Sequence, residues 1–353
     1  MTQATVPLST SGRPRVQLQT PNHVNTLRDH LQTSLPLLQT VPGLVGMTLN
    51  GGLSRGYGDQ LSEIDVTLYL TTKTFTQWQR EQSPFAQGIT KLDGQLYDLK
   101  VVEFTAEQSK PWSSDTLWDA SYAEILYDPE QQLATLFAER LAHWPAPDEA
   151  QGHMMSCWWY FQLAGDIWIY RGDVIQGHHI FNQAVVALLK ALFIANREWI
   201  PHEKWLFHLS RTLAWTPEHW PEQLQAAMST GDFTVASLRH RQRVIATLWA
   251  DVDAYLIARY WPDLPVHVMQ KSFYTLLHQL NQAGTLSPEA WAAAGGHSFF
   301  NLDPFHKIVT VDEQGIHLDR ERLLALQPEA IYAWHFAVAA AVRSGTTTRS
   351  ELR

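Results

Sequence analysis

The chain has 353 residues, 45% of them hydrophobic and 17% charged, and its formal net charge at pH 7 is −9. This length and balance are those of a soluble globular protein with room for two domains, each with its own core. The negative charge argues against a protein whose main task is to bind the nucleic-acid backbone, because that affinity depends on many Lys and Arg contacts with phosphates.

The polar N-terminus lacks the basic and apolar regions of a signal peptide, and no stretch of the sequence reads as apolar for long enough to span a bilayer. We therefore expect a cytoplasmic protein that does not contact a membrane. The single cysteine, Cys157, excludes an intrachain disulfide and a zinc cluster of cysteines. Residues 1–20 are rich in Thr, Ser, Pro and Gln without periodicity, which predicts a flexible arm.

The first half of the chain alternates helix and strand patterns. Apolar residues at helical spacing predict a helix over residues 23–38, and Pro42-Gly43 separates it from a strand over residues 44–49. A glycine-rich turn and a second strand over residues 62–70 follow. The other elements expected here are a helix near 75–82, strands at 89–92 and 96–104 joined by the hairpin turn Asp93-Gly94, a strand at 123–127 and a helix at 132–144. These elements predict a first domain over residues 21–147.

The second half reads as mostly helical. Pro145-Ala146-Pro147-Asp148 marks the expected domain boundary, and a helical domain is predicted over residues 148–353. Its amphipathic patterns cover residues 153–170, 180–195, 203–213, 235–260, 266–283 and 320–341, with one hairpin signal between residues 307 and 318.

The turn between the first two strands reads Gly51-Gly52-Leu53-Ser54-Arg55-Gly56, and the second strand reads Ser62-Glu63-Ile64-Asp65-Val66. Alternation along a strand places Glu63 and Asp65 on one face and the apolar residues on the other. Glycines let backbone N–H groups approach phosphate oxygens, and paired carboxylates hold divalent cations. The order predicts a phosphate-and-metal site. The alternative is a glycine turn before an edge strand with a solvated acidic face, but Asp and Glu are poor strand formers.

The run from Gly51 to Asp65 resembles the signature of the polymerase-β-type nucleotidyltransferases, most closely their small-molecule and antibiotic adenylyltransferase branch. The chain departs from that signature twice, since the family usually has Ser at the position of Gly52 and Asp at the position of Glu63. The resemblance implies an α+β fold, with an N-terminal mixed β-sheet flanked by helices and a C-terminal α-helical bundle domain that binds substrate.

The resemblance also implies roles for individual residues. Glu63 and Asp65 would hold two Mg²⁺ ions, and Asp98, on a neighbouring strand, would be the general base or a third metal ligand. Glu103 is the alternative third carboxylate, although its odd offset from Asp98 places it on the other strand face. The residues expected to bind the triphosphate of ATP are Gly51, Gly52, Ser54, Arg55 and Ser62.

Two runs in the helical half also resemble the substrate-side domain of such enzymes. They are Tyr170-Arg171-Gly172-Asp173 and the Asn-x-x-x-x-Pro-x-x-Lys-Trp-Leu pattern from Asn196 to Leu206. By this resemblance Asp173 would face the acceptor, and Lys190 or Lys204 would reach the triphosphate. The alternatives are structural: Asp173 as a helix start, and the two lysines as exposed surface residues.

The predicted reaction transfers AMP from ATP to a hydroxyl of a small-molecule acceptor and releases pyrophosphate. Three alternatives stay open at this point. One is a nucleotidyltransferase that modifies RNA or protein, as related toxins do. Another is a non-catalytic nucleotide-binding module, suggested by Gly52 and Glu63. The third is a helical RNase of the Arg-x-x-x-x-His type, suggested by Arg197 and His202, although Pro201 disfavours one continuous helix.

Overall fold

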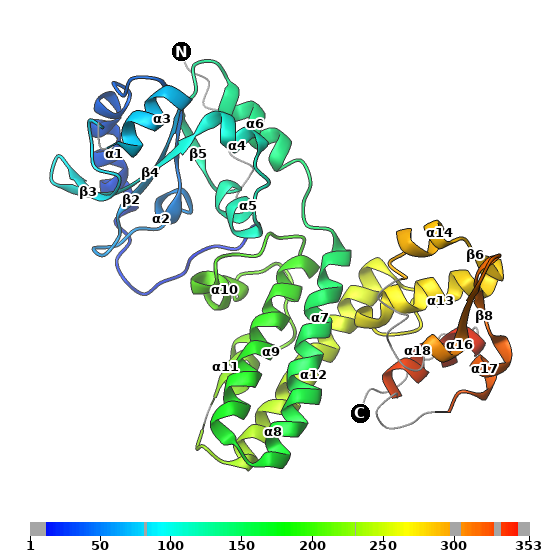
Figure 1. Cartoon of the computed structure of the whole chain (residues 1–353). Coiled ribbons are helices and arrows are strands. Elements are labelled where there is room, and N and C mark those ends of the chain that lie inside the picture. The colour runs from blue at the N-terminus through cyan, green and yellow to red at the C-terminus, as the bar shows by residue number, and fades with distance from the viewer. Residues whose placement is uncertain (1–11, 81–82, 230, 297–304, 328–332, 345–353) are drawn as a thin grey trace. The chain divides into compact units, whose positions relative to one another are not determined.

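The computed structural model describes residues 12–80, 83–229, 231–296, 305–327 and 333–344 (Figure 1). The chain divides into two compact units, which we describe separately. Unit 1 contains Met1–Ala146 and Leu192–Glu218, and unit 2 contains Pro147–Ala191 and His219–Arg353. The α+β class is confirmed, because unit 1 holds a mixed five-stranded sheet and the C-terminal part of the chain is mostly helical.

The sheet of unit 1 has the strand order β3-β4-β2-β1-β5. Strands β2 and β4 run parallel, whereas the pairs β1–β2, β1–β5 and β3–β4 are antiparallel. The strands are β1 (Leu44–Leu49), β2 (Ile64–Leu70), β3 (Gly88–Leu92), β4 (Gln95–Glu103) and β5 (Glu124–Tyr127). They match the predicted strands within two residues, and Asp93 and Gly94 form the predicted hairpin turn with φ values of 49° and 83°.

The two sheet faces differ in what covers them. One face packs its apolar side chains against α1 (Val24–Leu38) and α3 (Thr72–Gln79) to form the main core of unit 1. A smaller apolar cluster on the other face includes Tyr69 of β2 and residues of three helices, namely α4 (Phe104–Ser109), α5 (Ser114–Ala120) and α6 (Gln132–Arg140). The cluster does not include the start of β2, where this second face carries polar side chains.

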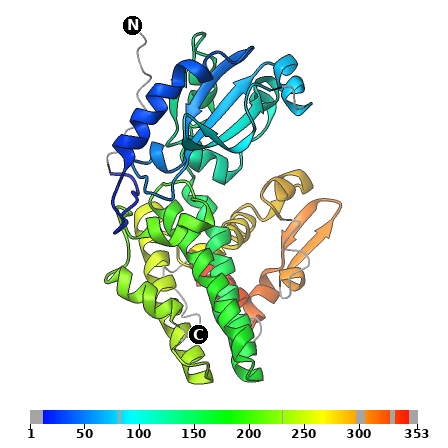
Figure 2. The same cartoon turned by 90° about the vertical axis from the view of Figure 1, so that its left-hand side faces the viewer.

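Unit 2 is built on long helices. Helix α12 (Val235–Tyr260) packs along a continuous helical segment made of α7 (Ala150–Trp158), the π-helical turn η2 (Trp159–Ala164) and α8 (Gly165–Arg171), as two views show (Figures 1 and 2). The remaining elements of this unit are η1 (Pro147–Glu149), most of α9 (Val174–Ala195), α11 (Trp220–Met228), η3 (Val268–Gln270), α13 (Lys271–Ala283), α14 (Pro288–Ala293), α16 (Phe305–Ile308), α17 (Arg320–Ala325), α18 (Ala333–Ser344), and strands β6 (Thr285–Leu286), β7 (Val309–Asp312) and β8 (Gly315–Leu318).

The structure changes several predicted elements. The helix expected over residues 320–341 is described as two helices, α17 and α18, and residues 328–332 lie outside the described residues. The hairpin of β7 and β8 gains a third strand, β6, beside β8. Within the described part of the chain, α9 is long and apolar enough to cross a membrane, with a mean hydropathy of 1.4. This corrects our expectation from the sequence, although 67% of that stretch is buried, as in the core helix of a globular protein.

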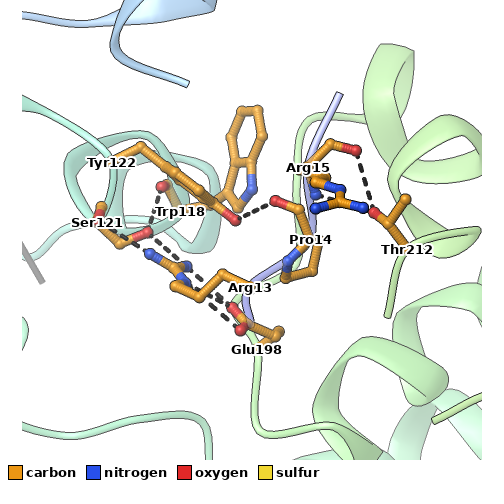
Figure 3. A network of polar contacts seen from close by, with 8 residues as sticks. All are labelled: Arg13, Pro14, Arg15, Trp118, Ser121, Tyr122, Glu198 and Thr212. Atoms are coloured by element: carbon orange, nitrogen blue, oxygen red, sulfur yellow. Dashed lines mark hydrogen bonds and ion pairs between the residues drawn. The ribbon is translucent and has the colours of Figure 1, made fainter. Parts of the chain in front are cut away.

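The segment that follows Gly12 is packed rather than flexible (Figure 3). The guanidinium of Arg13 donates hydrogen bonds to Glu198 Oε2 at 2.9 Å and to the backbone oxygen and Oγ of Ser121, both at 3.0 Å. It also lies 4.0 Å from the ring centre of Tyr122, whose hydroxyl donates to the backbone oxygen of Pro14 at 2.9 Å. The flexible arm predicted for residues 1–20 is therefore wrong for this part, and residues 1–11 lie outside the described residues.

The same contacts explain why Leu192–Glu218 groups with unit 1 rather than with the helical domain predicted over residues 148–353. Glu198 binds Arg13, and Thr212 exchanges two hydrogen bonds with the backbone of Arg15. Because these partners are nearly 200 residues apart in sequence, no local pattern could reveal the pairing.

We expect Arg13→Ala to lower the free energy of unfolding by about 3 kcal/mol, because it leaves the Glu198 carboxylate buried without its counter-charge. Urea denaturation of the full chain near pH 7 measures this change. Arg15→Ala is the matched control and should change stability by less than about 0.5 kcal/mol, since Arg15 is exposed and bonds Thr212 only through its backbone. Equal effects of the two substitutions would contradict the proposed importance of the ion pair.

Candidate functional site

Two carboxylates meet at the centre of the sheet. In the parallel pairing of β2 with β4, Asp65 lies directly opposite Asp98. Neighbouring strands are about 4.8 Å apart, and paired residues present their side chains on the same face. Strand β2 begins at Ile64, so Asp65 lies inside the strand and Glu63 lies immediately before it. The sequence had predicted both acids within the strand.

The glycine-rich turn holds the Asp65 carboxylate. Gly51–Ser54 forms a short helical turn, α2, directly after β1, and Gly51 adopts a φ of +66°. A Cβ atom on Gly51 would lie 1.8 Å from Asp65 Oδ2, so only glycine allows this close approach. The backbone N–H of Asn50 donates to the backbone oxygen of Asp65 at 2.9 Å. The turn and the acid are therefore one packed unit.

The departure from the family signature at Gly52 has a physical reason in this backbone. A Cβ on Gly52 would lie 2.9 Å from the backbone oxygen of Tyr57. That distance is too short for the serine that the signature usually carries, unless the chain around Tyr57 moves. Glycine therefore fits this position better than serine, and for that reason the turn lacks the hydroxyl group that the signature usually has here.

Negative charge is concentrated around Asp65. Burial, followed by the charges of Glu63, Asp119 and Asp98, raises the pKa of Asp65 to about 6, against the opposing effect of Arg55. Three acidic side chains thus raise the pKa of Asp65, and Arg55 offsets them only in part. A bound cation would relieve this repulsion, which fits the chemistry of a Mg²⁺ site. However, no group of three or more His, Cys, Asp or Glu side chains in the described ranges is arranged to hold a metal ion.

Arg55 is engaged within the protein. Its guanidinium donates to Asp119 Oδ1 at 2.7 Å and lies 4.5 Å from the ring centre of Trp118, and its side chain is only 6% exposed. The predicted contact of Arg55 with the triphosphate stays a prediction, and it would compete with this ion pair. Asp119 and Trp118 lie on α5, a helix that we did not predict, although the helix-capping residue Ser113 was a usable signal for its start.

The two serines expected to bind phosphate form hydrogen bonds with the local backbone. Ser54 is buried, and its hydroxyl donates to the backbone oxygen of Gly51 at 3.0 Å. The Ser62 hydroxyl accepts from the backbone N–H of Asp59 at 2.9 Å. Both hydroxyls stabilise the local backbone on either side of the carboxylates.

Glu103 is placed away from the carboxylate pair. It pairs with Leu70 at the opposite end of β2 from Asp65. Its carboxylate accepts from the backbone N–H of Ala106 at 3.1 Å and from the Thr72 hydroxyl at 2.6 Å, which makes it the N-terminal cap of α4. Asp98 is thus the acid that the sheet places beside Asp65.

The remaining predicted residues fall in both units. Lys204 is exposed on α10 (Glu203–Ser210) of unit 1. Asp173 and Lys190 belong to unit 2, where Asp173 accepts from the backbone N–H of Gln176 at 3.0 Å at the start of α9 and Lys190 is half-buried within that helix. Arg197 lies in the loop after α9 with a φ of +61°, so it shares no helix with His202.

A cavity of about 270 Å³ lies on the sheet face that carries the carboxylates. Thr67 lines it two residues after Asp65, and Lys100 lines it two residues after Asp98, so alternation places all four on one face. The lining is completed by Asn50, Tyr69, Val102, Glu107, Trp112, Ser113, Asp115, Thr116, Asp119, Ala120, Phe137 and His202. Every lining residue belongs to unit 1.

Comparison with known proteins adds limited information. Residues 111–206 match a family described as a domain of unknown function (DUF4037). No curated protein matches the chain. A solved structure that resembles it is that of a nucleotidyltransferase-like protein from Exiguobacterium sibiricum, with a TM-score of 0.41 and 9% sequence identity over 83% of this chain and 97% of that chain.

We expect Asp65→Asn to stabilise the metal-free protein above pH 6 and to have little effect at pH 4. The folded-state pKa of about 6 lies above the unfolded value of about 4, so the stability linked to Asp65 is fully present below pH 4 and is lost as the pH rises through 6. The gain at pH 8 should be about 2 to 3 kcal/mol by urea denaturation. Asp93→Asn, in the exposed hairpin turn, is the control and should show no such pH dependence.

Substitution of two glycines tests the packing of Asp65. Gly51→Ala places a Cβ against the carboxylate, whereas Gly56→Ala, at a φ of +78°, meets nothing within 4 Å. Both changes strain a left-handed backbone, so their difference isolates the clash. We expect Gly51→Ala to lower the melting temperature clearly more than Gly56→Ala in a thermal unfolding experiment. Equal losses would show that the contact with Asp65 is unimportant.

Proposed function

We propose that the chain is a metal-dependent nucleotidyltransferase that transfers AMP from ATP to a hydroxyl of a small molecule and releases pyrophosphate. The observation that carries this proposal is the pairing of Asp65 with Asp98 on adjacent parallel strands, beside the turn at Gly51. The signature from Gly51 to Asp65 supports the same reaction class. Carboxylates crowded on one open sheet face are suited to phosphoryl chemistry, which depends mainly on positioning and charge neutralisation.

The proposed metal site combines two of the carboxylates with the substrate. Glu63 and Asp65 would hold Mg²⁺ together with the phosphate oxygens of ATP, and the ion when bound neutralises phosphate charge and makes the α-phosphorus more electrophilic. Burial and neighbouring negative charge raise the pKa of Asp65, and a bound cation would relieve this repulsion and favour the ionised carboxylate. The raised pKa therefore supports a cation at this position.

The protein groups would then divide the remaining work. The backbone of the Gly51 turn would lie against the β- and γ-phosphates, and Asp98 would accept the proton of the acceptor hydroxyl. The hydroxyl oxygen forms a bond to the α-phosphorus, the bond from that phosphorus to the bridging oxygen breaks, and pyrophosphate leaves with the electron pair. Arg55, held by Asp119 and Trp118, would act by fixing the turn and by tuning the charge near Asp65 rather than by touching phosphate.

The first test is a turnover assay with the purified full chain, Mg²⁺, labelled ATP and a panel of hydroxylated small molecules. We expect acceptor-dependent release of pyrophosphate and an adenylated product. Asp65→Asn and Asp98→Asn should each reduce the rate by about 100-fold or more, and removal of Mg²⁺ with a chelator should abolish it. Asp93→Asn should leave the rate unchanged.

Other outcomes of this assay favour the alternatives. ATP binding without pyrophosphate release would favour a non-catalytic nucleotide-binding module. Transfer of label to RNA or to protein, but to no small molecule, would favour a macromolecular acceptor. Absence of ATP binding would contradict the proposal as a whole.

A further inference from the structure

One lysine, Lys100, lines the cavity beside the carboxylates, and it is exposed, so water solvates its ammonium until a ligand binds. Lys100 lies on β4, two residues beyond Asp98, and lines the cavity. In the described part of the chain its ammonium forms no ion pair or side-chain hydrogen bond. An ammonium without a partner at the wall of a cavity is a site for an anionic group of a ligand.

The acids that line the cavity already have basic neighbours. Asp119 binds Arg55 at 2.7 Å, Asp115 lies 3.5 Å from the His202 ring nitrogen Nδ1, and Glu107 lies 3.9 Å from the Lys110 ammonium. The last two contacts are weak, because the side chains of His202 and Lys110 are 44% and 63% exposed. The pattern nevertheless leaves Lys100 as the lining charge that lacks a partner.

The position of the cavity indicates which substrate it would receive. In an in-line displacement, the attacking and leaving oxygens lie on opposite sides of the phosphorus. The turn at Gly51 is packed against Asp65, and Lys100 lies beyond Asp98, the residue proposed to accept the hydroxyl proton. If pyrophosphate leaves on the side of the turn, the acceptor approaches from the side of the cavity.

We propose that this cavity binds the acceptor and that the acceptor is a small hydroxylated molecule carrying a phosphate or carboxylate group, which Lys100 binds. This inference rests on the proposed nucleotidyl transfer and names the chemical class of its acceptor. The volume of about 270 Å³ lies just below the usual range for drug-sized ligands, so it suits a molecule with one ring.

The other walls fit the rest of such a molecule. Tyr69, Trp112 and Phe137 provide aromatic surface against which the carbon skeleton of a ring packs. The hydroxyl and amide groups of Thr67, Thr116 and Asn50 can hydrogen-bond ligand hydroxyls. The adenylated product then carries its original anionic group together with the new phosphodiester, and the acceptor hydroxyl has lost one proton to Asp98.

The test uses four probes with the same ring: glucose, glucose 6-phosphate, glucuronate and glucosamine. Their binding to the full chain is measured by calorimetry without ATP or Mg²⁺, so that the result does not depend on turnover. We expect glucose 6-phosphate, glucuronate or both to bind about tenfold or more tightly than glucose and glucosamine. The two anionic probes distinguish a phosphate from a carboxylate.

Substitutions assign the preference to Lys100. Lys100→Met should abolish the advantage of the anionic probes, and Lys100→Arg should retain it. Lys91→Met, which removes an exposed lysine of β3 outside the cavity lining, is the matched control and should leave binding unchanged. Thermal unfolding checks that each variant is folded.

Several results would overturn the inference. They are tighter binding of glucosamine, equal binding of all four probes, binding of none of them, or an anionic preference that survives in Lys100→Met. The proposed function is tested separately. Selective binding of anionic probes without any AMP transfer would support anion binding in the cavity and contradict the proposed nucleotidyltransferase activity. AMP transfer to neutral or cationic acceptors alone would support the proposed activity and contradict the proposed role of Lys100.

Discussion

The parallel pairing of β2 with β4 is the constraint on which the candidate site depends. Its register places Asp65 opposite Asp98, and the same register places Thr67 opposite Lys100 in the wall of the cavity. Because side chains alternate along a strand, a slip of one residue would turn Asp98 to the apolar face and destroy both the carboxylate pair and the cavity. The buried residues that alternate with these polar ones, such as Val66 and Leu99, hold the register through the core.

Helix α5 connects this site to the stability of unit 1. Its Asp119 binds Arg55, and Trp118 lies against the same guanidinium. Just beyond the helix, Ser121 and Tyr122 contact Arg13, which in turn binds Glu198 (Figure 3). Three segments far apart in sequence therefore meet at the end of the helix that binds Arg55.

The charges of the site are arranged for a ligand rather than for stability. Burial and three neighbouring acids raise the pKa of Asp65 to about 6, so its ionised form is unfavourable, and Arg55 offsets this effect only in part. Beyond Asp98, the exposed Lys100 lines the cavity and has no ion-pair partner in the described part of the chain. Unfavourable charge interactions of this kind are typical of active sites, where substrates and ions supply the missing partners.

Local patterns in the sequence determined the five strands of unit 1, the helices α1, α3 and α6, and the candidate acids. Alternation predicted that Asp65 and the apolar side chains of its strand lie on opposite faces, and the glycine-rich run predicted a sharp turn, which forms at Gly51 with a φ of +66°. The approach of this turn to a phosphate stays a prediction, and its close packing against Asp65 was not predicted. The sequence did not predict that Arg55 would be bound by Asp119, that Ser54 and Ser62 would support turns, or that Arg13 would be buried against Glu198. These outcomes were decided by tertiary structure, because each depends on a partner from a distant segment, and the pairing of distant segments depends on how whole elements pack rather than on any local spacing.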